Sequence, residues 1–212
     1  MRVPGLGKLR RAGAYVRNRV EPNVLVLMYH RVADPVCDPW DIAVHPEHFA
    51  EHMRILARRG RIMTLAEVRE GLDAGRLERA VAITFDDGYL DTLQRAAPVL
   101  QRHGLRATVF ATTRGLTSGG ARMWWDPLGA ALLHDAPLPP RLELGDNGGR
   151  VAWDVPPPSD APLRRWRAEP VDRKDRGTPP PRARLYLEIY RDLAGREDAD
   201  RAARVEELVA WA

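Results

Sequence analysis

The stretch VAITFDDGYLDT, residues 81–92, decides how this part of the chain folds. Five residues suited to a buried strand lead directly into two adjacent carboxylates, Asp86 and Asp87, which are followed by Gly88. Carboxylates beside a buried strand cost free energy unless a metal ion, another cation or open solvent compensates their charge. The glycine lets the backbone turn sharply after the strand at little steric cost. The stretch therefore predicts a strand that ends in a polar turn.

Strand and helix patterns alternate on both sides of this stretch. Strands are predicted at residues 23–30, 61–65, 80–85 and 106–113, and helices at residues 46–59, 65–75 and 89–103, the last bent near Pro98. Such alternation indicates an α/β fold with a parallel sheet and right-handed crossovers. Reactive groups gather at the carboxyl ends of parallel strands, and Asp86, Asp87, Tyr29 and His30 all fall at such ends.

The second half of the chain has a different pattern. Residues 123–135 predict a short helix with an aromatic start, and residues 142–155 predict a hairpin because an Asn-Gly pair separates two apolar runs. Residues 156–181 are rich in proline, arginine and aspartate and predict a loop. Two further helices are predicted at residues 182–194 and 199–211.

Composition limits the class of protein. Of the 212 residues, 44% are hydrophobic and 29% are charged, which is typical of a soluble globular chain. A net charge of +4 without a dense basic run gives no support for a nucleic-acid partner. Cys37 is the only cysteine, so an internal disulfide is excluded. No signal peptide or membrane span is predicted, and we expect a location in the cytoplasm or at the membrane periphery.

The segment TFDDGYLDT, preceded by VLMYHRV, resembles the polysaccharide deacetylase family, which includes chitin, peptidoglycan and nodulation-factor-type deacetylases. Residues 84–88 match the family's first motif, Thr-Phe-Asp-Asp-Gly, residue for residue, and the Tyr-His pair at 29–30 resembles its exopolysaccharide-modifying branch. The resemblance covers roughly residues 23–133 and implies a distorted (β/α) barrel. It implies hydrolysis of N-acetyl groups on amino-sugar glycans with a divalent metal, zinc.

The resemblance also assigns roles to individual residues. It implies that Asp86 is the general base, that Asp87 is a metal ligand, and that His30 and Tyr29 line the mouth of the barrel as substrate-binding residues. The implied activation of a metal-bound water suits two neighbouring carboxylates with different tasks.

The same resemblance suggests a division of the chain. Residues 1–22 form a basic leader, residues 23–114 the N-terminal part of the barrel, and residues 115–212 an insertion with a hairpin and helices. The family's second motif, His-Ser/Thr-x-x-His, has no counterpart after His134, the last histidine. We therefore expect a truncated and inactive chain whose open sheet edge favours self-association.

Two other interpretations stay open. A catalytically dead carbohydrate- or partner-binding module would keep the barrel mouth without its metal. A zinc peptidase would use His48 and His52, which have the His-x-x-Glu-His spacing of inverted zinc peptidases. Aspartyl phosphotransfer is disfavoured because its two aspartates lie two residues apart, whereas here they are adjacent.

Overall fold

The fold is described from a computed structural model of the 212-residue chain. The structure describes residues 23–77, 79–112, 123–134, 136–146, 149–157, 166, 168 and 179–211. The expected leader, residues 1–22, and most of the expected loop at residues 156–181 lie outside these ranges.

Two compact units make up the described chain. The first contains the described residues up to Asp34 together with Ala43–Ala111. The second contains Pro35–Ile42 and the described residues from Thr112 onward. The short segment Pro35–Ile42 thus leaves the first unit and returns to it at Ala43.

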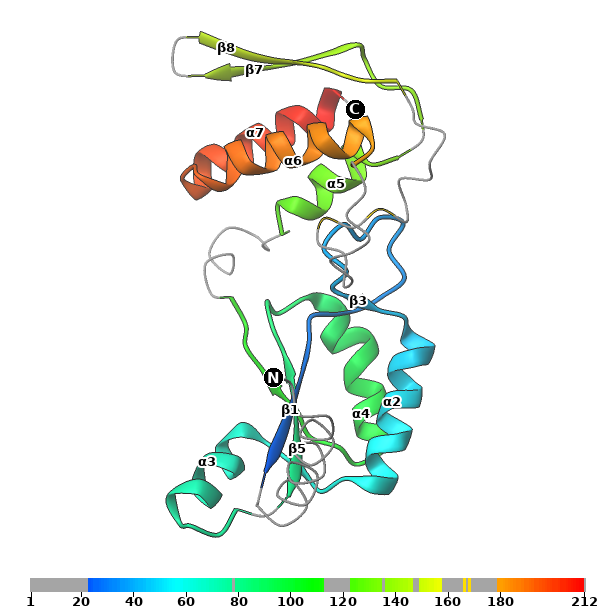
Figure 1. The fold of residues 1–212 in the computed structure, drawn as a ribbon, viewed down its shortest axis with the longest axis vertical. Helices are drawn as coiled ribbons and strands as arrows, with labels where there is room; N and C mark the ends of the chain where they lie inside the picture. The colour runs from blue at the N-terminus through cyan, green and yellow to red at the C-terminus, as the bar shows by residue number, and fades with distance from the viewer. Residues whose placement is uncertain are drawn as a thin grey trace, which may run out of the picture. The chain divides into compact units, whose positions relative to one another are not determined.

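A parallel sheet forms the centre of the first unit (Figure 1). Its strands are β1 (Val24–Tyr29), β4 (Ile62–Met63), β5 (Ala80–Phe85) and β6 (Thr108–Val109). β5 pairs in parallel with each of the other three, and its pairing with β1 runs from Val24 opposite Ala80 to Tyr29 opposite Phe85. The expected parallel α/β arrangement is therefore confirmed, whereas closure into a barrel stays a prediction.

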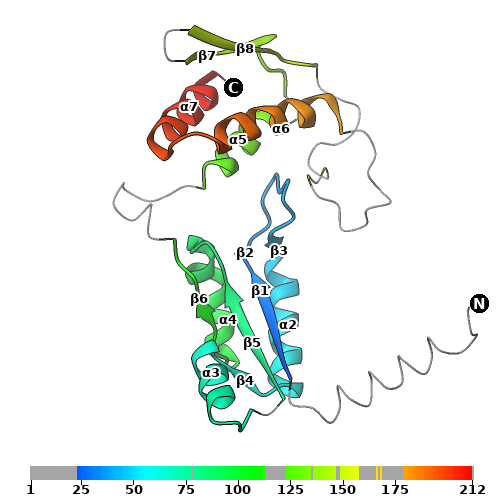
Figure 2. The ribbon, with the colours of Figure 1, turned by 60° about the vertical axis from the view of Figure 1, so that its left-hand side comes forward.

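The helices of the first unit pack against this sheet (Figure 2). They are α2 (Pro46–Arg59), α3 (Leu65–Asp73), the π-helical turn η1 (Thr92–Ala96) and α4 (Ala97–Arg102). Phe49 and Met53 of α2 are fully buried in a core that they share with Ile83 and Phe85 of β5. α4 contributes Val99 and its neighbours to the same core. The expected bend near Pro98 is the change from η1 to α4.

Local capping explains where α3 begins. The hydroxyl of Thr64 accepts a hydrogen bond from the backbone N–H of Glu67, and the Glu67 carboxylate accepts one from the backbone N–H of Thr64. This reciprocal pair is a capping box, which satisfies two backbone donors that a helix start would otherwise leave free. A two-stranded parallel sheet of β2 (Arg31–Val32) and β3 (Ala43–Val44) completes the first unit.

The second unit packs three helices with a hairpin. The helices are α5 (Trp125–Leu132), α6 (Pro181–Ala194) and α7 (Asp198–Trp211), and the hairpin pairs β7 (Arg141–Asp146) with β8 (Gly149–Asp154). Within this unit α6 and α7 lie between the hairpin and α5 (Figure 1). Its core includes Leu128, Tyr186 and Leu208, all fully buried. The expected hairpin and the three expected helices are thus confirmed.

None of the helices in the described ranges is long and apolar enough to cross a membrane. The location of the protein stays a prediction.

Candidate functional site

The loop with Asp86 and Asp87 begins at the carboxyl end of the most buried strand. Four consecutive β5 residues before the loop are buried, and Phe85, the last of them, is fully buried. The backbone N–H of Asp86 donates to the carbonyl oxygen of Tyr29 over 2.9 Å. The ends of β5 and β1 therefore meet, and the backbone brings Tyr29, His30, Asp86 and Asp87 to one edge of the sheet.

The backbone turns sharply at the second aspartate. Asp87 has φ 67° and Gly88 has φ 69°, so two successive residues lie in the left-handed region. Aspartate tolerates this region better than most residues, but it still costs a non-glycine residue about 1–2 kcal/mol. Strain of this kind persists where the surroundings hold it in place and is frequent at functional sites. It marks Asp87 as a candidate on geometry as well as on sequence.

Asp91 holds this turn in place. One carboxylate oxygen of Asp91 accepts a hydrogen bond from the backbone N–H of Val32 over 2.9 Å, and the other lies 3.1 Å from Nε of Arg31. The Arg31 guanidinium also lies over the Tyr89 ring, 4.7 Å from its centroid, in cation–π geometry. The loop after β5 is thereby tied to β2.

The sequence alone assigns no role to Asp91, Arg31 or Tyr89. Asp91 lies about 60 residues from its partners along the chain, so no local pattern reveals the contact. The available signal is the position of a third carboxylate shortly after the Asp-Asp-Gly turn.

Tyr29 points into the core rather than away from it. Its side chain is 9% exposed and packs edge-on against Phe49 and stacked on Phe85, with ring centroids 5.2 and 5.6 Å away. Its hydroxyl oxygen lies 3.2 Å from Nδ1 of His52 on α2. Burial raises the pKa of the Tyr29 phenol. In this arrangement the hydroxyl is engaged with His52, and substrate binding by Tyr29 or by the half-buried His30 stays a prediction.

The described residues do not fit a complete zinc site. A catalytic zinc ion takes three protein ligands and a water. All six histidines of the chain lie in the described ranges, and within those ranges no group of three or more histidine, cysteine, aspartate or glutamate side chains is placed to hold a metal. Asp86 and Asp87 are therefore not joined there by the histidines that the family resemblance implies.

The remaining histidines lie elsewhere. His48 and His52 are exposed on α2, and the described ranges offer no third ligand of the kind a zinc peptidase needs. His134 belongs to the second unit, where its Nδ1 accepts a hydrogen bond from the backbone N–H of Ala136 over 3.0 Å. It forms part of a turn after α5.

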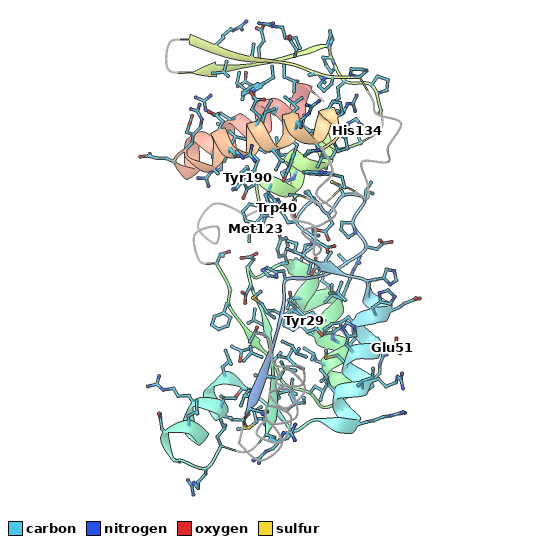
Figure 3. The ribbon with its side chains drawn as sticks, viewed as in Figure 1. Tyr29, Trp40, Glu51, Met123, His134 and Tyr190 are labelled. Carbon is cyan, nitrogen blue, oxygen red and sulfur yellow. The ribbon has the colours of Figure 1, made fainter. Side chains whose placement is uncertain are left out.

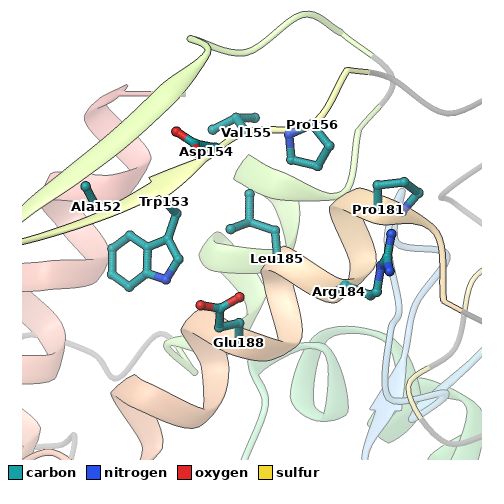
Figure 4. Close-up of a pocket in the computed structure, with 9 residues that line it drawn as sticks. All are labelled: Ala152, Trp153, Asp154, Val155, Pro156, Pro181, Arg184, Leu185 and Glu188. Carbon is teal, nitrogen blue, oxygen red and sulfur yellow. The ribbon is translucent and has the colours of Figure 1, made fainter.

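The second unit contains an open groove between β8 and α6 with a volume of about 550 Å³ (Figure 4). Its floor includes Trp153 and Leu185, and its rim carries the charged side chains of Asp154, Arg184 and Glu188. Aromatic faces bind sugar rings when the face is accessible, but Trp153 is only 7% exposed. The groove therefore offers a sugar little of this indole.

The aromatic residue Trp124 at the start of α5 also makes packing contacts. The Trp124 ring stacks on Tyr190 with centroids 4.7 Å apart, and the Arg201 guanidinium lies 5.3 Å from the Trp124 centroid. Figure 3 labels Tyr190 and Trp40, whose ring centroid lies 4.7 Å from that of Tyr190. These contacts make Trp124 a packing residue of the second unit.

Comparison with known proteins identifies the segment that contains the Asp-Asp-Gly turn. Residues 74–130 match a family model described as polysaccharide deacetylase. Over this segment the chain is similar to the polysaccharide deacetylase family. The matched segment begins at the end of α3 and includes β5, η1, α4 and β6, so it contains the whole of the candidate loop.

A curated protein is similar over part of the chain. YxkH of Bacillus subtilis (strain 168), a polysaccharide deacetylase by name, is 34% identical over 101 residues. The match covers 46% of this chain and 34% of YxkH, so the chain spans about a third of this curated relative.

Two solved structures are also similar. The Streptococcus pyogenes deacetylase PplD, in complex with acetate, is 25% identical with a TM-score of 0.41, and the match covers 51% of this chain and 52% of PplD. IcaB from Ammonifex degensii is 26% identical with a TM-score of 0.38, over 51% of this chain and 48% of IcaB. TM-scores of this size do not establish a shared fold.

Proposed function

We propose that this chain carries the first catalytic motif of a polysaccharide deacetylase that hydrolyses N-acetyl groups on amino-sugar glycans. The observation that supports this proposal is the Thr84–Gly88 motif, which lies inside the family-matched segment and at the carboxyl end of β5. In the proposed site Asp86 is the general base and Asp87 a ligand of a divalent metal, zinc. His30 and Tyr29 contribute to the substrate side of a (β/α) barrel of the exopolysaccharide-modifying branch.

The chain's own residues suit part of this task. Asp86 and Asp87 follow a buried strand whose end is fixed to β1, so the two carboxylates are held by rigid elements. Asp91 fixes the next turn through Val32 and Arg31. A loop held in this way keeps Asp86 in a constant position relative to the sheet, as a general base requires.

The described residues supply too few ligands for the metal of the proposed site. No histidine of the described ranges joins Asp87 in a group of three metal ligands. We propose that the chain alone does not release acetate. The absence of a three-ligand group in the described ranges also supports the alternative function, a carbohydrate- or partner-binding module without catalysis.

An assay for acetate release from N-acetylglucosamine oligomers tests the proposal, with zinc added or removed by a chelator. Zinc binding is measured in parallel by calorimetry, with Asp87→Ala as the control. Acetate release that is lost with chelator, with Asp86→Asn and with Asp87→Ala would establish the deacetylase and refute inactivity. Oligomer binding that ignores the chelator, without acetate, would favour the binding module. An absence of acetate release is the result expected for the chain alone, and an absence of oligomer binding would contradict the binding module.

We also propose that the chain self-associates through β1. In the described ranges β1 pairs only with β5, and Val26 and Met28 of β1 are 50% and 63% exposed. An apolar edge strand is a template for pairing with another chain. Analytical ultracentrifugation tests this proposal, and a monomer over the whole concentration range would contradict it.

A further inference from the structure

We propose that His48 and His52 of α2 form a two-histidine chelate for a divalent transition-metal ion, at a position separate from Asp87. α2 is a regular helix from Pro46 to Arg59, and both imidazoles are exposed on it. Side chains four residues apart on a helix are neighbours on one face, with Cβ atoms about 5–6 Å apart. Two exposed imidazoles at this spacing can reach one metal ion.

Two buried neighbours show where the face with His48 and His52 lies on α2. Phe49 and Met53 are both fully buried, and each directly follows one of the two histidines. His48 and His52 therefore occupy equivalent positions beside the buried stripe of α2, one turn apart. Figure 3 labels Glu51, which directly precedes His52 on this helix.

The contact with Tyr29 prepares His52 for binding. Nδ1 of His52 lies 3.2 Å from the Tyr29 hydroxyl, so the other ring nitrogen, Nε2, is left for a ligand. A metal ion on Nε2 requires the proton to be on Nδ1, from which it donates to the Tyr29 oxygen. Histidine ligands commonly use their second nitrogen in this way, and such partners fix the tautomer and the ring orientation.

A third histidine, His45, lies nearby but has another task. Its ring centroid is 5.5 Å from that of His48. Nδ1 of His45 accepts a hydrogen bond from the backbone N–H of Glu47 and caps α2, so the neutral ring carries its proton on Nε2. While His45 caps the helix it has no free nitrogen for a metal. The proposed site therefore has two protein ligands and is completed by water.

The chemistry of two imidazoles selects the ion. Imidazole suits zinc, copper and nickel, whereas magnesium and calcium prefer oxygen ligands. Affinity of a nitrogen site rises from cobalt through nickel to copper. We therefore expect the chain to bind Cu²⁺ more tightly than Ni²⁺, to bind Zn²⁺ more weakly than Cu²⁺, and to show no binding of Mg²⁺ at α2.

The experiment is a Ni²⁺ titration of the full chain by calorimetry, with folding checked by circular dichroism. His48→Gln and His52→Gln are each expected to weaken binding by about tenfold or more, whereas His103→Gln leaves it unchanged. The double variant E47H/H48Q keeps the number of histidines but places them five residues apart, and it is expected to bind as weakly as His48→Gln. Tyr29→Phe keeps the packing, removes the partner of Nδ1 and is expected to weaken binding.

Three results would overturn the proposal. The first is unchanged binding in His48→Gln or His52→Gln, and the second is wild-type binding in E47H/H48Q. The third is loss of Ni²⁺ binding in Asp87→Ala, because it would place the ion in the loop after β5. The acetate assay is independent of this titration, so failure of the chelate leaves the proposed deacetylase function standing, and the reverse also holds.

Discussion

Replacement of Asp91 is expected to destabilise the first unit strongly, because one carboxylate satisfies two groups. Val32 is fully buried, so its backbone N–H has no access to water when the Asp91 acceptor is removed. A hydrogen bond to a charged group contributes about 1.5–3 kcal/mol. The Arg31–Asp91 pair, whose side chains are 21% and 11% exposed, adds up to about 1 kcal/mol. For Asp91→Ala we therefore expect a loss of about 3 kcal/mol.

A matched variant separates the two contributions. Asp91→Asn keeps an oxygen acceptor for the Val32 N–H but loses the charge that pairs with Arg31. It is therefore expected to cost only about 1 kcal/mol, with most of the difference from Asp91→Ala due to the buried donor. Arg31→Met removes the ion pair alone and is expected to cost less than about 1 kcal/mol.

The assay must report on the first unit. All six tryptophans belong to the second unit, so their fluorescence does not follow the unfolding of the first unit directly. Urea denaturation is therefore followed by far-ultraviolet circular dichroism, with hydrogen exchange of the Val32 amide as a local probe. The amide is expected to be protected in wild type and Asp91→Asn and less protected in Asp91→Ala, where its hydrogen-bond acceptor is lost. Equal protection in all three proteins, or equal losses for both Asp91 variants, would refute the reasoning.

Three further predictions concern single side chains. Among the described residues the buried Thr92 hydroxyl has no hydrogen-bond partner. Thr92→Val should therefore raise the free energy of unfolding by about 1 kcal/mol in urea denaturation, and a lower free energy of unfolding would show that the hydroxyl has a partner. The backbone N–H of Thr64, followed by the Thr64 hydroxyl and an arginine, lowers the pKa of Glu67. The ionised Glu67 carboxylate therefore stabilises the fold fully above the ordinary carboxyl pKa, and this stabilisation is lost as pH falls through the lowered pKa. Glu67→Gln should flatten the acid side of the plot of unfolding free energy against pH. Identical plots for the variant and wild type would contradict this. Arg182 is 1% exposed and donates hydrogen bonds to three backbone carbonyls. Arg182→Met should therefore lower the free energy of unfolding by about 3 kcal/mol, measured by tryptophan fluorescence. A decrease below about 1 kcal/mol would argue against this role.

The elements with strong local signals could be predicted from the sequence. Pro46 and Gly60 bound α2 because proline suits the first turn of a helix and glycine suits the residue after its end. Continuous apolar residues predict β5 because side chains on both faces of this strand are buried. The hairpin of β7 and β8 follows from the Asn-Gly pair between two apolar runs.

The contacts of the candidate site could not be predicted in the same way. The apolar run of β1 has no alternation that would show which face Tyr29 occupies, so its contact with Phe49 and His52 appears only when α2 is packed. The contact of Asp91 with β2 depends on the parallel pairing of β1 and β5, which brings segments about 60 residues apart together. The inclusion of Pro35–Ile42 in the second unit also depends on distant packing, because Trp40 contacts Tyr186.

The two metal proposals affect how any titration of this protein is interpreted. A zinc isotherm alone does not distinguish ligation by Asp87 from ligation by His48 and His52, since zinc accepts both oxygen and nitrogen donors. Carboxylate ligands suit Mg²⁺ or Mn²⁺, whereas the histidine pair on α2 favours Ni²⁺ and Cu²⁺. Zinc binding that survives His48→Gln and disappears with Asp87→Ala therefore supports the deacetylase site. Zinc binding with the opposite response belongs to α2 and carries no information about catalysis, even when it is tight and of one-to-one stoichiometry.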